Sequence, residues 1–165
     1  MRTRYAIGLL VLDVDGVLTD GRLYFGARGE ALKVFDVRDG YGLVALRRAG
    51  ITVAVISGRR SAAVQARCRE LGIRHVHQGV ADKLAVFERL RSRLGLARGA
   101  CACVGDDLPD VPLMKAVGLA FAVADAHGAA RRAAHRVTRR GGGRGAVREV
   151  CDLLLTTRAR SGRAR

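Results

Sequence analysis

The chain contains no tryptophan, two prolines and few aromatic side chains, which make up 4% of its 165 residues. Proteins that bind single-stranded nucleic acid stack bases on aromatic side chains, so this shortage disfavours that function even though the net charge is +15. Long hydrophobic runs are absent as well, because the run at residues 7–12 ends at Asp13, well short of the roughly 20 residues that span a bilayer. We therefore expect a protein without a membrane segment that stays in the cytoplasm.

Lysine is scarce, so nearly all of the positive charge is arginine, and residues 126–165 hold eleven arginines against two acidic residues. A chain of this length buries about 70% of its unfolded surface and needs no disulfide or structural metal to fold. The four cysteines lie in apolar segments without zinc-ligand spacing and are predicted to be buried free thiols. We expect one domain over residues 1–157 and a disordered basic tail over residues 158–165.

Apolar segments alternate with segments of helical period along the chain, a pattern typical of a parallel sheet covered by helices on both faces. The predicted strands are residues 7–13, 52–56, 75–77, 100–104, 119–123 and 135–137. The predicted helices are residues 42–49, 61–71, 83–94, 111–117, 128–134 and 146–155, with Asp39, Ser61, Asp82 and Asp110 as N-caps. These elements predict a three-layer α/β domain.

Residues 22–25 and 31–37 depart from this alternation. A glycine-bearing turn at residues 26–29 joins them, which predicts a β-hairpin inserted between the first strand and the first helix. No composition shift marks a cap domain. Any structure that covers a ligand site in this protein must therefore be small or come from another subunit. The glycine-rich residues 141–145 fit either a mobile lid or a plain loop before the last helix.

Polar side chains gather where the predicted strands end and where one helix begins. They are Asp13, Asp15, Ser57, Lys83, Asp106, Asp107 and Asp110. Ligands of open parallel sheets bind outside the carboxyl ends of the strands. Because several carboxylates in one pocket repel one another unless a cation neutralises them, and because oxygen ligands suit a hard ion, the sequence predicts a Mg²⁺ site there.

Four short motifs resemble, in order, those of the haloacid-dehalogenase-like phosphohydrolases. They are Asp13-Val-Asp-Gly-Val-Leu-Thr19, Ser57, Lys83 and Gly105-Asp-Asp-x-x-Asp110. Longer runs at residues 20–24, 35–42, 122–127 and 142–149 resemble one group among them, the 3-deoxy-D-manno-octulosonate 8-phosphate phosphatases. The resemblance covers about residues 5–157 and implies a Rossmann-like parallel sheet with a hairpin insertion and no cap domain.

The resemblance also implies a Mg²⁺-dependent phosphatase that works through an aspartyl-phosphate intermediate. Asp13 would be the nucleophile, and Asp15 would protonate the leaving sugar oxygen and later deprotonate the attacking water. Mg²⁺ would be held by Asp13, Asp106 and the backbone carbonyl of Asp15, with Asp107 close behind. The resemblance thus implies that Asp13 serves both as nucleophile and as metal ligand.

Further residues would hold the substrate. Ser57 and Lys83 would bind the phosphoryl oxygens, and Arg59 and Arg67 suit a bidentate grip on the carboxylate of a sugar acid. The complete set of substrate-binding residues that the resemblance implies is Asp15, Asp36, Val37, Arg38, Asp39, Gly40, Gly58, Arg59, Arg67 and Lys83.

By this resemblance the substrate is 3-deoxy-D-manno-octulosonate 8-phosphate, an intermediate of lipopolysaccharide biosynthesis, and the protein is a homotetramer in which each hairpin helps close a neighbour's site. Asp36 stands where the group commonly has asparagine, and Val44 stands where it commonly has a basic residue. Another acidic, nonulosonic sugar phosphate is therefore an alternative substrate. A catalytically silent domain that oligomerises or binds polyanions is the alternative outside enzymes, and the gathered carboxylates and Lys83 argue against it.

Overall fold

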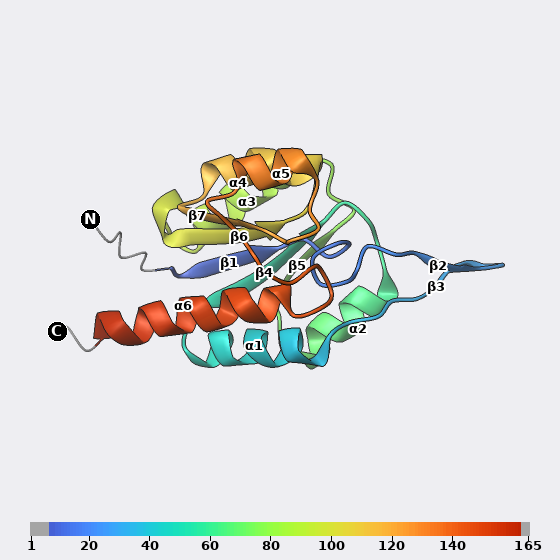
Figure 1. The fold of residues 1–165 in the computed structure, drawn as a ribbon, viewed down its shortest axis with the longest axis horizontal. Helices are drawn as coiled ribbons and strands as arrows, with labels where there is room; N and C mark the ends of the chain where they lie inside the picture. The colour runs from blue at the N-terminus through green and yellow to red at the C-terminus, as the bar shows by residue number, and fades with distance from the viewer. Residues whose placement is uncertain (1–6, 163–165) are drawn as a thin grey trace.

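The computed structural model describes residues 7–162, with side chains through residue 159. Six parallel strands form the middle layer of the molecule (Figure 1). They are β1 (Leu9–Leu12), β4 (Thr52–Ser57), β5 (His75–Gln78), β6 (Cys101–Gly105), β7 (Leu119–Ala122) and β8 (Arg136–Val137). Their order in the sheet is β5-β4-β1-β6-β7-β8. The chain therefore reverses its direction of sheet growth at β1, and such a reversal leaves a crevice for ligands.

Helices cover both faces of the sheet, which confirms the predicted three-layer α/β fold (Figure 1). One face carries α1 (Val37–Arg48), α2 (Ala62–Glu70) and α6 (Ala146–Gly162). The other carries α3 (Lys83–Arg93), α4 (Val111–Ala116) and α5 (Gly128–Ala133), and two 3₁₀ turns, η1 (Arg98–Ala100) and η2 (Leu108–Asp110), precede β6 and α4. No helix in the described part of the chain is long and apolar enough to cross a membrane.

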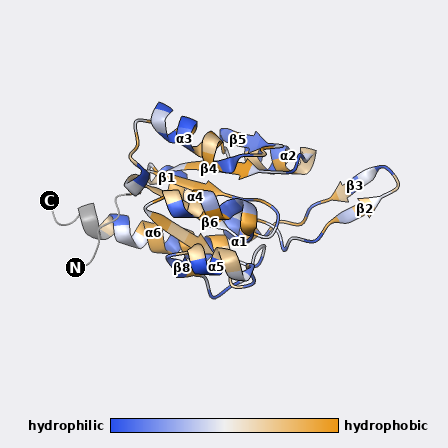
Figure 2. Cartoon of the chain, turned by 90° about the horizontal axis from the view of Figure 1, so that it is seen from above, coloured by the Kyte–Doolittle hydropathy of each residue, from blue (hydrophilic) through white to orange (hydrophobic). Residues whose placement is uncertain are grey.

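The central strands are buried because both of their faces lie under helices. Every residue of β1, β6 and β7 is buried, and Figure 2 shows hydrophobic residues along the middle of the sheet. This explains why these strands are continuous apolar runs without polar alternation. The four cysteines are free and buried in this core, as predicted.

The inserted hairpin consists of β2 (Tyr24–Gly26) and β3 (Gly29–Leu32) and projects well away from the body of the molecule (Figures 1 and 2). Its second strand ends earlier than predicted, because residues 33–36 lead directly into α1. Large apolar side chains of this segment are exposed, among them Phe25 at 64%, Val34 and Leu32. A two-stranded ribbon alone is marginally stable in water, and exposed apolar patches of this kind mark interaction surfaces.

The start of helix α1 differs from the sequence prediction. Helix α1 begins at Val37, and its N-cap is Asp36, whose carboxylate accepts the Arg38 N–H, so the prediction of Asp39 as the cap was wrong. Asp39 lies inside the first turn, where it is buried. Gly40 and Gly42 lie in the first turns of α1, where glycine lowers helix propensity.

Of the other three predicted N-caps, one caps its helix through its side chain and two do not. Asp82 caps α3 through the Ala85 N–H, as predicted. Ser61 and Asp110 occupy the N-cap positions of α2 and α4 but make no side-chain cap hydrogen bond. Helix α6 continues to Gly162, so residues 158–162 of the segment predicted as a disordered tail are helical here, and residues 163–165 lie outside the described part.

Candidate active site

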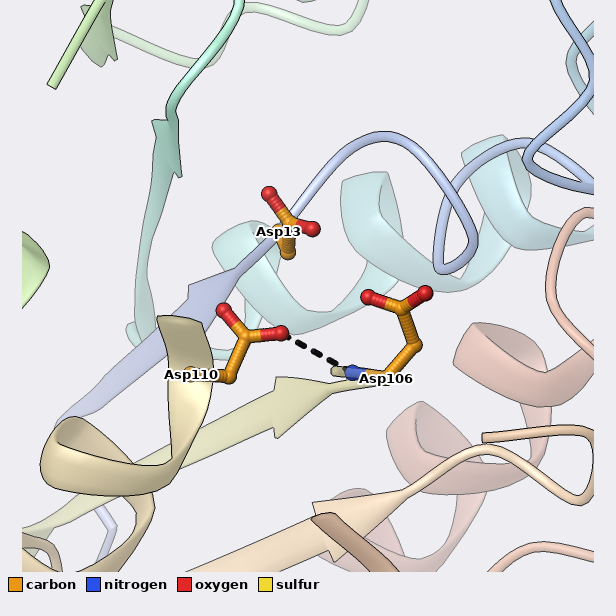
Figure 3. Close-up of side chains that lie close together, drawn as sticks. All are labelled: Asp13, Asp106 and Asp110. Atoms are coloured by element: carbon orange, nitrogen blue, oxygen red, sulfur yellow. Dashed lines mark hydrogen bonds between the residues drawn. The ribbon is translucent and has the colours of Figure 1, made fainter. Parts of the chain in front are cut away.

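Three carboxylates meet at the carboxyl end of the sheet. Asp13 follows β1, Asp106 follows the neighbouring strand β6, and Asp110 ends η2, so the side chains point toward one another (Figure 3). One oxygen of each lies within 4.8 Å of the others. The parallel pairing of β1 and β6 produces this meeting, because their carboxyl ends lie side by side.

Lys83 joins the cluster from the first turn of α3. Its Nζ lies 2.8 Å from Asp13 Oδ1 and 2.7 Å from Asp110 Oδ1, and its side chain is 7% exposed. Burial acts to lower the pKa of Lys83, but the two carboxylates outweigh it and raise the pKa above its ordinary value. Lys83 is therefore a fixed positive charge beside Asp13.

Asp110 belongs to the fourth motif, and the sequence predicted it only as the N-cap of a helix. Its Oδ2 accepts the N–H of Asp106 at 2.9 Å and that of Asp107 at 3.3 Å, while Oδ1 accepts from Lys83. The side chain thus fixes both the loop that carries Asp106 and the direction of Lys83. The position of Asp110, four residues after Asp106 in the same motif, was the sequence signal that could have indicated this role.

Burial and like charges act together on these carboxylates. Burial, followed by the charge of Asp110, raises the pKa of Asp13 to about 6, although Lys83 opposes this. Burial and the charges of Asp13, Asp110 and Asp107 raise the pKa of Asp106 to about 8. At pH 7 Asp13 is ionised, whereas Asp106 ionises with difficulty until a further positive charge is present.

The charges around the three carboxylates show whether a divalent cation suits this site. Within residues 7–159, no basic side chain lies within 4.0 Å of Asp106, whereas the single charge of Lys83 is shared between Asp13 and Asp110. The facing donors are all oxygen atoms, as a hard cation such as Mg²⁺ requires. Asp13 and Asp106 therefore form a suitable pair of ligands, and Asp110 is already engaged by Lys83 and two backbone amides.

The other residues predicted to act in catalysis lie around this cluster. Ser57 is buried at the end of β4, and its Oγ accepts the Arg59 N–H at 3.3 Å. Asp15 lies on the loop after β1, with its Oδ2 4.0 Å from Arg59 Nε. The Asp107 carboxylate caps η2 through the Leu108 N–H, so it adds negative charge near Asp106 without joining the three facing carboxylates.

The predicted sugar-acid residues of α1 and α2 have other contacts in this chain. Asp36 forms a bidentate pair with Arg38, and Asp39 is buried and accepts the backbone N–H of Arg148 at 2.8 Å. Arg67 pairs with Glu70 and lies over Gly40. Among the described residues, no hydrogen bond or ion pair joins this group to Asp13, so its role in substrate binding stays a prediction.

Val37 and Gly58 complete the predicted set. The Val37 side chain is 77% exposed at the start of α1. Gly58 follows Ser57 and is also exposed. Gly58 thus lies at the same edge of the sheet as the carboxylate cluster.

Residues 141–145 form a closely packed loop against the loop that carries Asp15. The Gly143 N–H donates to the Val17 carbonyl at 2.9 Å, and the Gly142 N–H donates to Asp125 Oδ1 at 2.9 Å. A Cβ on Gly142 would collide with the backbone of Gly16. The glycines thus permit close backbone contact, which favours the plain-loop interpretation over a mobile lid.

Replacing Gly142 by alanine is expected to lower the free energy of unfolding by about 3 kcal/mol, because the added methyl group forces two backbone segments apart. Urea denaturation followed by circular dichroism measures the change. Gly99→Ala is the matched control, since a Cβ there meets nothing within 4 Å. Equal free energies of unfolding for the two variants would show that the loop accommodates the added methyl group without loss of stability.

Two residues near Asp15 escaped the sequence analysis. Lys33 follows β3 and pairs with Asp15, and Glu30, which lies within β3, pairs with Lys33. The one sequence feature that could have indicated them is that they are charged residues in a segment with many apolar ones. The hairpin therefore contacts the site of its own chain.

Comparisons with known proteins agree with this geometry. Residues 37–118 match a family model described as haloacid dehalogenase-like hydrolase. The 3-deoxy-D-manno-octulosonate 8-phosphate phosphatase of Escherichia coli K12 is 55% identical over 149 residues, which cover 90% of this chain and 79% of that protein.

Two solved structures extend the comparison. The Yersinia pestis phosphatase of the same name has a TM-score of 0.92 at 50% identity, with 94% of this chain and 84% of that chain covered. The Moraxella catarrhalis enzyme, solved with magnesium, phosphate and a KDO molecule, has a TM-score of 0.90 at 42% identity, with 93% and 88% covered. The chain therefore belongs to the 3-deoxy-D-manno-octulosonate 8-phosphate phosphatases, phosphoric monoester hydrolases of the haloacid dehalogenase-like family.

Proposed function

We propose that this protein hydrolyses 3-deoxy-D-manno-octulosonate 8-phosphate to the free sugar acid and inorganic phosphate, a step of lipopolysaccharide biosynthesis. The observation that carries the proposal is the position of Asp13, which lies at the end of β1 opposite Asp106 and 2.8 Å from Lys83. The similarity to phosphatases of that substrate runs over 90% of the chain. Site and sequence thus favour the same reaction.

The proposed reaction has two displacements at phosphorus. In the first, a carboxylate oxygen of Asp13 bonds to phosphorus while the bond to the sugar oxygen breaks, and Asp15 gives its proton to that oxygen. In the second, Asp15 takes a proton from water as the water oxygen bonds to phosphorus and the bond to Asp13 breaks. Asp13 suits the nucleophilic role because its pKa of about 6 leaves it ionised at neutral pH.

Other groups of the chain would stabilise charge on the transferred phosphoryl group. Lys83 is buried and already directed at Asp13, and Ser57 and the backbone N–H groups beyond β1 lie at the same edge of the sheet. Asp13, Asp106 and the backbone carbonyl of Asp15 would hold Mg²⁺, with Asp107 behind them. When bound, Mg²⁺ supplies positive charge that offsets both the carboxylates and the phosphoryl oxygens.

The sugar acid also carries a carboxylate, for which we propose Arg59 as the first contact. Its side chain is 43% exposed, and its guanidinium lies at the edge of the site near Asp15 and Glu30. The two departures from the group's pattern have structural explanations, since Asp36 caps α1 and Val44 packs partly buried against the core. Neither observation favours a different sugar.

Phosphate release from a panel of sugar phosphates in the presence of Mg²⁺ tests the proposal. We expect the octulosonate phosphate to have the highest kcat/KM, with nonulosonic acid phosphates and neutral hexose phosphates well below it. Equal turnover of all members would contradict the specific assignment. Faster turnover of a nonulosonic acid phosphate would support the alternative substrate.

We also propose that the protein is a homotetramer and acts in the cytoplasm. The exposed apolar side chains of the projecting hairpin support self-association, and together with Phe25 they include Leu23, Tyr24, Leu32 and Val34. Free cysteine thiols persist in reducing compartments, which supports a cytoplasmic location.

The Phe25→Glu variant is expected to dissociate into smaller species, because a charge on this surface must be desolvated in any interface that covers it. Light scattering after size-exclusion chromatography measures the mass. Val137→Glu, which alters an exposed apolar residue on β8, is the matched control and should keep the wild-type mass. A monomeric wild-type protein would refute the homotetramer.

A further inference from the structure

Lys33 is a buried lysine held between two carboxylates. Its side chain is 2% exposed, and its Nζ lies 2.5 Å from Asp15 Oδ1 and 3.0 Å from Glu30 Oε2. Lysine is almost never buried to this degree unless it is paired. Of the three lysines, Lys115 is exposed, whereas Lys33 and Lys83 form ion pairs with carboxylates that follow β1.

Glu30 fixes Lys33 from the other side. The Ser61 hydroxyl donates to Glu30 Oε1 at 2.6 Å, and Arg59 Nη2 lies 3.5 Å from Glu30 Oε2. Burial acts to raise the pKa of Glu30, but hydrogen bonds from Ser61 and Lys33 outweigh it and hold the pKa below its ordinary value. Ser61 makes this contact instead of capping α2, so β3 is tied to the start of that helix.

Asp15 needs such support because it lies on a loop. Among the hydrogen bonds of the described residues, the one that its carboxylate accepts comes from Lys33, while Arg59 Nε stands 4.0 Å away. A carboxylate that must deliver a proton to one oxygen has to be held in place, since a displacement of about 1 Å can cost about 100-fold in rate.

We infer that Lys33, fixed by Glu30, is a positioning residue that holds the Asp15 carboxylate in place for proton transfer. The inference rests on the proposed function of Asp15. It gives the hairpin base a task within its own subunit, separate from any contact with a neighbour. Lys33 acts through Asp15 and transfers no proton itself.

The test compares two leaving groups in the Lys33→Met variant. A sugar alkoxide needs a proton as it leaves, whereas the nitrophenolate of 4-nitrophenyl phosphate leaves without one. The kcat/KM for the octulosonate phosphate is expected to fall about 100-fold, and that for 4-nitrophenyl phosphate by less than about threefold. The parameter kcat/KM reports cleavage of the ester bond and excludes the later hydrolysis of the aspartyl-phosphate.

Two further variants sharpen the experiment. Glu30→Gln keeps Lys33 but weakens its anchoring, and we expect the same selective loss at about 10-fold. Lys115→Met removes the exposed lysine and should change neither substrate's kcat/KM. The ratio of the two substrates is taken within one protein sample, so it does not depend on the fraction that folds.

Equal losses for the two substrates in Lys33→Met would overturn the inference, because a general structural defect affects both. A rise in KM for the sugar phosphate alone would also overturn it and would make Lys33 a contact of the sugar acid. Failure of wild type to hydrolyse the octulosonate phosphate would refute the proposed function instead. The leaving-group ratio would then be measured with whichever alkyl phosphate the wild-type enzyme hydrolyses.

Discussion

The Asp13→Asn protein is expected to fold like wild type and to release phosphate at least about 10⁴-fold more slowly. The amide cannot form the bond to phosphorus that the ionised carboxylate forms. Single-turnover phosphate release with the octulosonate phosphate and Mg²⁺ measures the loss. Activity within tenfold of wild type would show that another group attacks phosphorus.

The fold should survive this change because asparagine has nearly the same shape as aspartate. It also removes one charge from a cluster in which burial and Asp110 already raise the pKa of Asp13 to about 6. Without Mg²⁺, the free energy of unfolding at pH 8 should therefore equal or exceed that of wild type. Asp152→Asn, on the exposed side of α6, is the matched control and should keep full activity.

The second large effect concerns Asp106, pH and Mg²⁺. The pKa of Asp106 is raised from 3.8 to about 8 in the folded protein, mainly by burial and then by Asp13. The folded state thus holds this proton more tightly than the unfolded state, and the stability gained is complete below pH 3.8 and lost as the pH rises toward 8. Metal-free protein should become less stable over this range, and Mg²⁺ should restore stability at pH 8.

The Asp106→Asn variant isolates this contribution. The pKa values of Asp13 and Asp39 are also raised, to about 6, so their effects are nearly complete by that pH. Between pH 6 and 8 without Mg²⁺, the variant should lose roughly 2 kcal/mol less of its unfolding free energy than wild type loses.

Urea denaturation at pH 6 and pH 8, with and without Mg²⁺, measures both effects. The variant should gain little stability from the metal, whereas the Asp152→Asn control should respond as wild type does. If the stability of Asp106→Asn had the same pH dependence as that of wild type, the ionisation of Asp106 would not be the cause of the loss of stability.

The layered fold could be predicted because buried parallel strands leave a simple pattern. The apolar runs that became β1, β4, β6 and β7 were each located to within two residues of their ends. Helix boundaries were less accurate where local composition misleads. Helix α1 contains glycines 40 and 42, and α6 extends through an arginine-rich end, so both are longer than predicted.

The meeting of Asp13, Asp106 and Lys83 was also predictable, because residues that follow neighbouring parallel strands share one edge of the sheet. The partners of these residues were not. Asp110 had been assigned to cap a helix, yet it binds Lys83 and the loop of Asp106. The catalytic roles themselves stay predictions that the variants above can test.

The order of strands and helices, and the edge at which the carboxylates gather, follow from short-range patterns of residue type. The pairing of individual charges does not, because it joins positions far apart in the chain, 18 residues between Asp15 and Lys33 and 27 between Lys83 and Asp110. Which ammonium reaches which carboxylate depends on how the packed elements exclude water around them. Burial makes each of these contacts strong, and burial is a property of the folded chain.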